Sequence, residues 1–227
     1  MRAPCILVFA FVAALPGVAS AQAFAPGFHA LPNGAKVAMM PIDIELYSIS
    51  AGGIPEPKAD WTEAARRNFR QAFLNRKDSL GISVLEVPGA ALDELVEFNA
   101  VETAVARAIV VHHLGPSHLP TKGGNLDWSL GDAAHIARKV TGADYALYTW
   151  VRDSYASAER QAAIVAMALL GVGIPGGQQA AYASLVDLNT GRVLWFNRIQ
   201  RGTGDLREPD KAQETLDVLL DKFPAAK

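Results

Sequence analysis

Residues 179–201, QAAYASLVDLNTGRVLWFNRIQR, contain two apolar segments separated by Asn189-Thr190-Gly191. Residues 179–188 and 192–201 each have the length and composition of a β-strand. A short connection that contains glycine is typical of a hairpin with a bulge. This stretch therefore predicts an antiparallel hairpin at the centre of a sheet. The candidate inward residues are Tyr182, Val186, Val193 and Trp195.

Residues N-terminal to the hairpin, and the C-terminal segment, supply the other elements. Strand-like sequences occur at 36–46, where Pro41 indicates an edge or a bulge, and at 81–87 and 143–152. Apolar residues at helical spacing predict helices over 61–77, 92–113, 129–142, 161–170 and 209–223. Asp60 with Glu63, and Ser129 with Asp132, each resemble a capping box.

The order of these elements predicts a single α/β (α+β) domain over residues 36–227. It would contain a mixed β-sheet of about five strands with helices packed against it. Residues 22–35 are rich in Ala, Pro, Gly and Phe without periodicity, so we expect an irregular N-terminal segment there. No internal repeat or linker divides the chain.

Residues 1–21 have the pattern of a secretory signal peptide. Arg2 precedes an apolar run over 5–15, and the small residues Ala19-Ser20-Ala21 form a cleavage site. The apolar run is shorter than the ~20 residues of a spanning helix. We expect cleavage near Ala21 and a periplasmic or secreted mature protein that begins at Gln22.

Composition excludes several kinds of site. Cys5 is the only cysteine and lies in the segment expected to be removed, so the mature chain would have no disulfide, thiolate metal site or cysteine nucleophile. Cys5 stands at the start of the apolar run instead of after its end, so there is no lipobox. The 21 basic and 23 acidic residues give a formal charge of −2 without a run of like charge, which disfavours nucleic acid as a partner.

Residues 162–174, AAIVAMALLGVGI, contain no charged side chain. A helix that is apolar on all sides must be covered. Three alternatives follow: a buried core helix, a contact with another protein molecule, or insertion into a membrane surface. The candidate interaction residues are Ala166, Leu169, Leu170, Val172 and Ile174.

Residues 171–176 match the G-x-G-x-x-G pattern of dinucleotide-binding loops. That motif needs a strand before it and a helix after it. Here a predicted helix precedes the glycines and a strand follows them. We therefore expect a flexible connection and no cofactor, although a small-ligand binding module that uses this loop stays an alternative.

Histidines concentrate between residues 112 and 135, and imidazole is a common ligand of zinc and copper. His112, His118 and His135 are the candidate ligands, with Asp127 and Asp132 nearby in sequence. No H-E-x-x-H motif and no G-x-S-x-G nucleophile elbow is present. A periplasmic hydrolase or metal-dependent enzyme built on this region is an alternative, whereas the principal expectation is that there is no metal and no catalytic residue.

Two motifs resemble those of bacterial envelope proteins related to the curli secretion channel and the TolB amino-terminal domain. They are Thr141-Gly142-Ala143-Asp144-Tyr145 before a strand and ASLVDLNTGRVLW at 183–195, and the resemblance covers residues 135–200. It implies an α/β sandwich with helices on one side of a mixed sheet and a non-enzymatic role in the envelope. Together with the export signal, this favours a non-catalytic cell-envelope protein that acts by protein–protein interaction with an envelope partner or by self-assembly.

Overall fold

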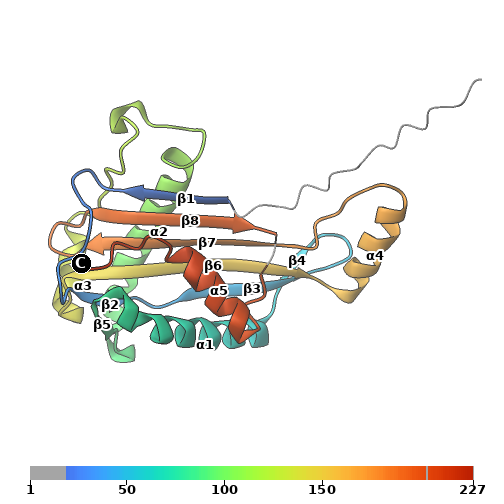
Figure 1. Cartoon of the computed structure of the whole chain (residues 1–227), viewed down its shortest axis with the longest axis horizontal. Helices are drawn as coiled ribbons and strands as arrows, with labels where there is room; N and C mark the ends of the chain where they lie inside the picture. Colours follow the sequence, from blue (N-terminus) through green and yellow to red (C-terminus); the bar gives the residue numbers. More distant parts are fainter. Residues whose placement is uncertain (1–18, 203, 227) are drawn as a thin grey trace, which may run out of the picture.

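The computed structural model describes residues 19–202 and 204–226, so residues 1–18 of the expected signal peptide, including Cys5, lie outside the described residues. Within these ranges the strands form one mixed sheet of eight (Figure 1). Their order is β1-β8-β7-β6-β2-β5; β3 pairs with β6 beyond β2, and β4 pairs with β3. The strands are β1 (Ala19–Phe24), β2 (Lys36–Met39), β3 (Asp43–Ile49), β4 (Pro55–Pro57), β5 (Ser83–Glu86), β6 (Tyr145–Ala156), β7 (Gly177–Asp187) and β8 (Val193–Arg201).

The hairpin predicted from residues 179–201 is confirmed as β7 and β8. Its register shifts between Leu185 and Val186, which is the bulge that the short glycine-containing turn indicates. Gly191 has φ +73°, and a Cβ there would lie 2.5 Å from the carbonyl oxygen of Gly131, so only glycine fits.

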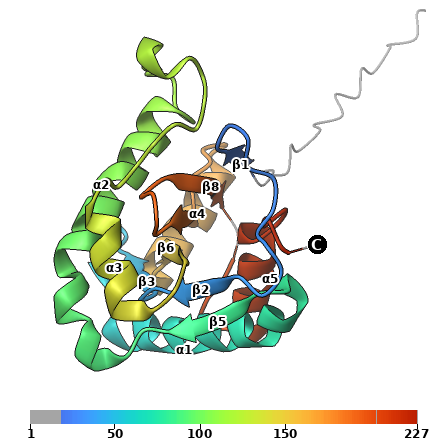
Figure 2. The same cartoon turned by 90° about the vertical axis from the view of Figure 1, so that its left-hand side faces the viewer.

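Helices cover both faces of the sheet (Figure 2). One apolar layer contains Leu185 and Trp195 with residues of α1 and α5, and the other contains Val186 and Phe196 with residues of α2 and α3. Successive side chains therefore enter opposite layers, and the central strands are buried on both sides. The helices are α1 (Ala59–Arg76), α2 (Val96–His112), α3 (Ala133–Thr141), α4 (Ala158–Leu169) and α5 (Pro209–Leu219). The expectation of helices on one side only is wrong, because the central strands are apolar on both faces.

The predicted strand over 36–46 is two strands, β2 and β3, that follow one another along β6. Met39 pairs with Leu147 and Asp43 with Trp150, so three residues of this segment stand opposite two residues of β6. The extra residue is the bulge that Pro41 indicated. The bulge changes which side chains point to which face of the sheet. Val37 and Ile44 both lie in the layer of α1 and α5, whereas in an unbroken strand residues seven apart would point to opposite faces.

Residues 22–24 are not irregular, since they belong to β1, which pairs antiparallel with β8. This pairing uses backbone hydrogen bonds, which need no apolar periodicity. The two expected capping boxes are also wrong. Lys58 and Asp132 occupy the N-cap positions of α1 and α3 without a side-chain cap, and the Ser129 hydroxyl instead accepts from the Gly131 N–H at 3.0 Å. No described helix is long and apolar enough to cross a membrane.

Candidate functional site

The ends of β6 and β7 and the helix between them project beyond the layers of the domain (Figure 1). We call residues 153–179 the arm. Its two strands stay paired as far as Tyr155 and Gly177, and the Ala156 N–H donates to the Gly176 carbonyl. A Cβ at Gly177 would lie 2.1 Å from the Ser154 carbonyl oxygen, so this close approach requires glycine.

Helix α4 begins and ends with defined contacts within the arm. The Ser157 hydroxyl accepts from the Arg160 N–H at 3.2 Å, and the Ser157 N–H donates to the carbonyl of Ile49 in β3. The Arg160 guanidinium donates twice to the Pro175 carbonyl, at 3.1 and 3.3 Å, which ties the start of the helix to the returning chain. The arm is therefore held as a structured unit.

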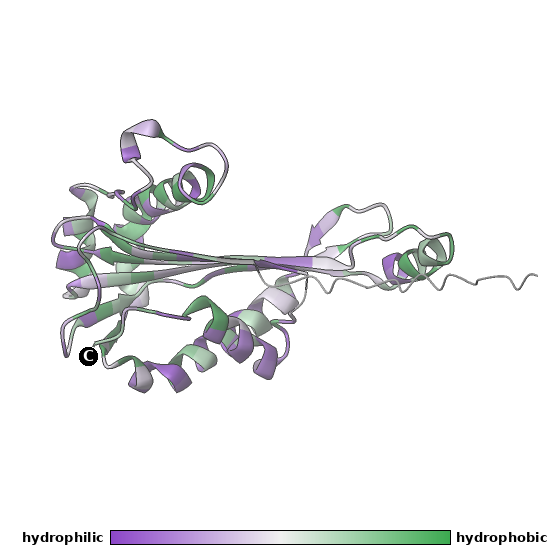
Figure 3. Ribbon diagram, turned by 45° about the horizontal axis from the view of Figure 1, so that its top comes forward, coloured by the Kyte–Doolittle hydropathy of each residue, from purple (hydrophilic) through white to green (hydrophobic). Residues whose placement is uncertain are grey.

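No residue of α4 is buried, and the apolar side chains at its end are the most exposed in the arm. Leu169 is 85% exposed and Leu170 is 76% exposed. Figure 3 shows this hydrophobic helix at the end of the molecule, away from the other helices. The alternative of a buried core helix is wrong, because the long strands β6 and β7 carry α4 away from both apolar layers.

The predicted interaction residues all lie in this part of the arm. Ala166, Leu169, Leu170 and Val172 are exposed, whereas Ile174 is half-buried. Val165 is also exposed and was not singled out in the sequence. We call Val165, Leu169, Leu170 and Val172 the apolar tip.

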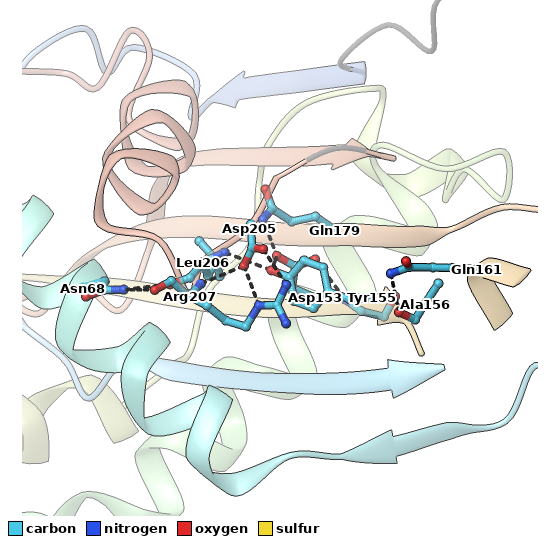
Figure 4. Close-up of polar contacts among 10 residues, drawn as sticks. Asn68, Asp153, Tyr155, Ala156, Gln161, Gln179, Asp205, Leu206 and Arg207 are labelled. Carbon is cyan, nitrogen blue, oxygen red and sulfur yellow. Dashed lines mark hydrogen bonds and ion pairs between the residues drawn. The ribbon is translucent and has the colours of Figure 1, made fainter. Parts of the chain in front are cut away.

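A buried carboxyl group lies at the base of the arm (Figure 4). Asp153 accepts hydrogen bonds from the Tyr155 hydroxyl at 2.5 Å, the Gln179 amide at 2.7 Å and the Ser154 N–H at 2.9 Å. The Tyr155 hydroxyl in turn accepts from the Leu206 N–H at 2.9 Å. These bonds join both strands of the arm to the loop before α5.

Cationic side chains connect this base to the helices of one layer. Arg201 donates to the Gln179 amide oxygen at 2.8 Å, to the Thr215 hydroxyl at 2.6 Å and to Glu214 at 2.8 Å, and the last two are residues of α5. Arg207 stacks on the rings of Trp61 and Tyr155, with its guanidinium carbon 4.5 and 4.3 Å from their centroids. The base therefore fixes the direction in which the arm leaves the domain.

Burial raises the pKa of Asp153 to about 6, against the opposing effect of its three hydrogen bonds. In the unfolded chain an aspartate has a pKa of about 3.9, so between pH 4 and 6 the folded state binds more protons. The stabilisation that Asp153 gains from protonation in the folded state is complete below about pH 4 and is lost as the pH rises through about 6.

We therefore expect acidification to stabilise the wild-type protein relative to Asp153→Asn. The difference in unfolding free energy between them should change by roughly 2 kcal/mol between pH 7 and pH 4. Urea unfolding at several pH values measures it, and Asp60→Asn, at an exposed position, is the control. A difference that is constant with pH would contradict the assignment.

The histidines that were candidate ligands in the metal-enzyme alternative do not form a ligand set. His112 hydrogen-bonds to the Ser117 carbonyl at 2.8 Å, and both His118 and His135 are exposed. Among the described residues, no group of three or more His, Cys, Asp or Glu side chains is arranged to hold a metal ion.

The glycine-rich segment 171–176 connects α4 to β7, so a helix precedes it and a strand follows it. This is the context expected from the sequence, and it differs from that of a dinucleotide-binding loop.

Comparisons with known proteins give a weak structural likeness. No family model matches the chain, and no curated protein matches it. A PelC dodecamer from Paraburkholderia phytofirmans is 15% identical with a TM-score of 0.40, over 93% of this chain and 100% of that chain. A single-residue variant of that dodecamer is 16% identical with a TM-score of 0.40, over 93% and 99%. Similarity at this level establishes neither membership of a family nor a function.

The polar base of the arm was not singled out from the sequence. Each of its polar residues is two positions along its strand from an apolar residue that faces the layer of α1 and α5. These pairs are Asp153 with Val151, Gln179 with Ala181, and Arg201 with Ile199. In strands such residues share a face. Polar residues at inward positions of three adjacent strands are the signal that could have indicated the site.

Proposed function

We propose that this protein is a non-catalytic, exported protein of the cell envelope that associates with itself through the apolar tip of the arm. The observation that carries the proposal is the exposure of the tip on a structured projection. Contiguous exposed apolar surface on a soluble domain marks an interaction site. Because Arg160 and the base of the arm hold the projection in place, the tip is presented without further ordering of the chain.

A second copy of the chain suits the tip better than a membrane surface does. Helices that lie on membranes combine an apolar face with Lys or Arg on the polar face and with aromatic residues. Helix α4 contains no Lys and no aromatic residue, and its one Arg, Arg160, donates to the Pro175 carbonyl within the arm. An uncharged surface can face its own copy without like-charge repulsion, and the exposed Ala162 and Ala166 would let two helices approach closely.

The location in the envelope rests on the sequence. The signal-peptide pattern of residues 1–21 supports export, and the resemblance of residues 135–200 to envelope proteins stays a prediction. An envelope protein of another kind, or a membrane surface, is an alternative occupant of the tip that the experiment distinguishes.

Replacing Leu170 or Leu169 with glutamate should leave the protein folded and abolish self-association. Both side chains are exposed, so the change in unfolding free energy should stay within about 0.5 kcal/mol. A charge in a buried apolar contact is costly, so the oligomer should dissociate to monomers. Sedimentation of the mature protein, beside thermal unfolding, measures both effects.

Val96→Glu is the matched control, since Val96 is an exposed apolar residue at the start of α2, outside the arm. It should leave the oligomeric state unchanged. A wild-type protein that is monomeric at all concentrations would refute self-association. Loss of vesicle binding in the Leu170 variant alone would assign the tip to a membrane, and capture of one envelope protein by the wild type alone would assign it to that partner.

A further inference from the structure

A second feature, independent of the arm, is a cavity between α2 and the face of β6 and β7. Its volume is about 280 Å³. Polar and aromatic side chains from α1, α2, β3, β6 and β7, together with the β2–β3 bulge, surround it. They include Asp43, Asn99, Glu102, Tyr148, Trp150 and Tyr182.

Three residues that line this cavity each carry a buried polar atom without a hydrogen-bond partner among the described residues: Oε1 of Glu102, the hydroxyl of Tyr148 and Oδ1 of Asn99. Glu102 is 3% exposed and Tyr148 is 6% exposed. The other carboxylate oxygen of Glu102 accepts from the Tyr182 hydroxyl at 3.3 Å. Buried polar groups are nearly always hydrogen-bonded, so three unpartnered atoms at one cavity indicate a bound polar group.

The arginine side chains near this cavity have partners other than Glu102. Arg66 donates to the Ile44 carbonyl at 3.1 Å, and Arg152 pairs with Asp43 at 2.8 Å and stacks on the Trp150 ring. No described Lys or Arg forms an ion pair with Glu102. A buried carboxyl group without a cation is therefore left with free acceptor capacity.

We propose that this cavity binds the ammonium group of a small primary amine. The free oxygen atoms of Glu102, Asn99 and Tyr148 supply three acceptors, which matches the three N–H donors of an ammonium group. The rings of Tyr148, Trp150 and Tyr182 supply walls that a cation tolerates better than an anion.

An adjoining apolar cavity of about 330 Å³ defines the rest of the ligand. Thr103, Trp150 and Tyr182 line both cavities, and Val110, Val111, Ala180 and Ala181 make the second one apolar. Arg107 and Arg198 also line the second cavity, so a cation is disfavoured there. The ligand class is accordingly a short alkylamine with its ammonium group at Glu102 and its hydrocarbon chain toward Val110.

Proton release should accompany binding. Burial, with a smaller effect of the negative charge of Asp43, raises the pKa of Glu102 to about 8, although the nearby hydroxyls of Tyr182 and Ser184 oppose the shift. The group is mostly protonated at pH 7, and an ammonium ion beside it favours the carboxylate. Binding of the amine should therefore be tighter at pH 8.5 than at pH 6.5.

Calorimetric titration of the mature protein with n-butylamine, butan-1-ol and butyrate tests the proposal. Butylamine should bind at least about tenfold more tightly than butan-1-ol, because hydrogen bonds between charged groups are stronger than those of a neutral hydroxyl. Butyrate should not bind. Titrations in two buffers of different ionisation enthalpy should show the released proton.

Glu102→Gln should weaken butylamine binding by about tenfold or more, and Glu97→Gln, at an exposed position of α2, should not change it. Tyr148→Phe removes one of the three acceptors and is the second test variant if Glu102→Gln does not fold; it should also weaken butylamine binding. Equal binding of butan-1-ol, undiminished binding by Glu102→Gln, or no binding of millimolar butylamine would each overturn the assignment. Leu170→Glu should bind butylamine as the wild type does, so the test is separate from that of the arm.

Discussion

Trp195→Ala should lower the free energy of unfolding by about 3–5 kcal/mol and the melting temperature by roughly 10 °C. Trp195 is completely buried near the start of β8 and packs edge-to-face on Phe223, with ring centroids 5.4 Å apart. Truncation leaves a cavity that the neighbouring strands β1 and β7 cannot close. Chemical unfolding followed by circular dichroism measures the loss.

Trp195→Phe is the control for cavity size. The indole Nε1 of Trp195 has no hydrogen-bond partner among the described residues, so phenylalanine removes an unpaired buried donor while keeping most of the ring. It should cost about 1–2 kcal/mol. If Trp195→Ala had the same melting temperature as the wild type, Trp195 would lie outside the core and the two-layer packing would be contradicted.

Arg201→Ala should destabilise the protein by about 2–4 kcal/mol, because it removes hydrogen bonds from a buried charged group, which typically contribute ~1.5–3 kcal/mol each, together with the packing of the side chain. The Arg201 side chain is 1% exposed, and its loss removes the charged donor from the Gln179 amide oxygen and from the Thr215 hydroxyl, so that Gln179 Oε1 keeps only the 3.3 Å bond from the Thr215 hydroxyl. The arm should also become more susceptible to proteolysis, because Gln179 links Arg201 to Asp153 at its base. Urea unfolding and limited proteolysis measure the two effects.

Arg198→Ala supplies the comparison for Arg201. Arg198 lies on the same strand, is half-buried, and hydrogen-bonds only to the side chain of Gln200 among the contacts described. It should cost less than about 1 kcal/mol. If both substitutions cost the same, the network at the base of the arm would not contribute to stability as the geometry indicates.

The sequence predicted the central elements well because their signals are local. Residues 179–201 combine apolar strands with a glycine turn, and the helices around α1, α2, α3 and α5 have clear periodicity. Five predicted strands correspond to six of the eight observed, since the segment 36–46 is two strands. The edge strands β1 and β4 could not be predicted, because β1 is held by backbone pairing and β4 consists of Pro55, Glu56 and Pro57, residues that strands disfavour.

The arm shows what hydropathy leaves undetermined. The apolar composition of residues 162–174 indicated that this segment must be covered. It could not distinguish coverage by the core of the same domain from coverage by another protein molecule or a membrane surface. The lengths of β6 and β7 decide the question, and both strands are longer than predicted. Polar residues such as Asp153 and Gln178 made the strands appear to end early, although Asp153 is buried and Gln178 pairs with Ser154.

The bulge at residues 40–42 has a consequence for how this chain can vary in length. If one residue were deleted there, β3 would turn over, and Asp43, Glu45 and Tyr47 would point at α1 in place of Ile44 and Leu46. Buried carboxylates without partners are far costlier than a lost turn residue. Substitutions at the exposed Pro41 should accordingly be accepted more readily than any change in the number of residues between β2 and β3. The number of residues between β2 and β3 therefore decides which side chains of β3 face α1. One residue more or fewer would exchange the buried and the exposed side chains of the whole strand.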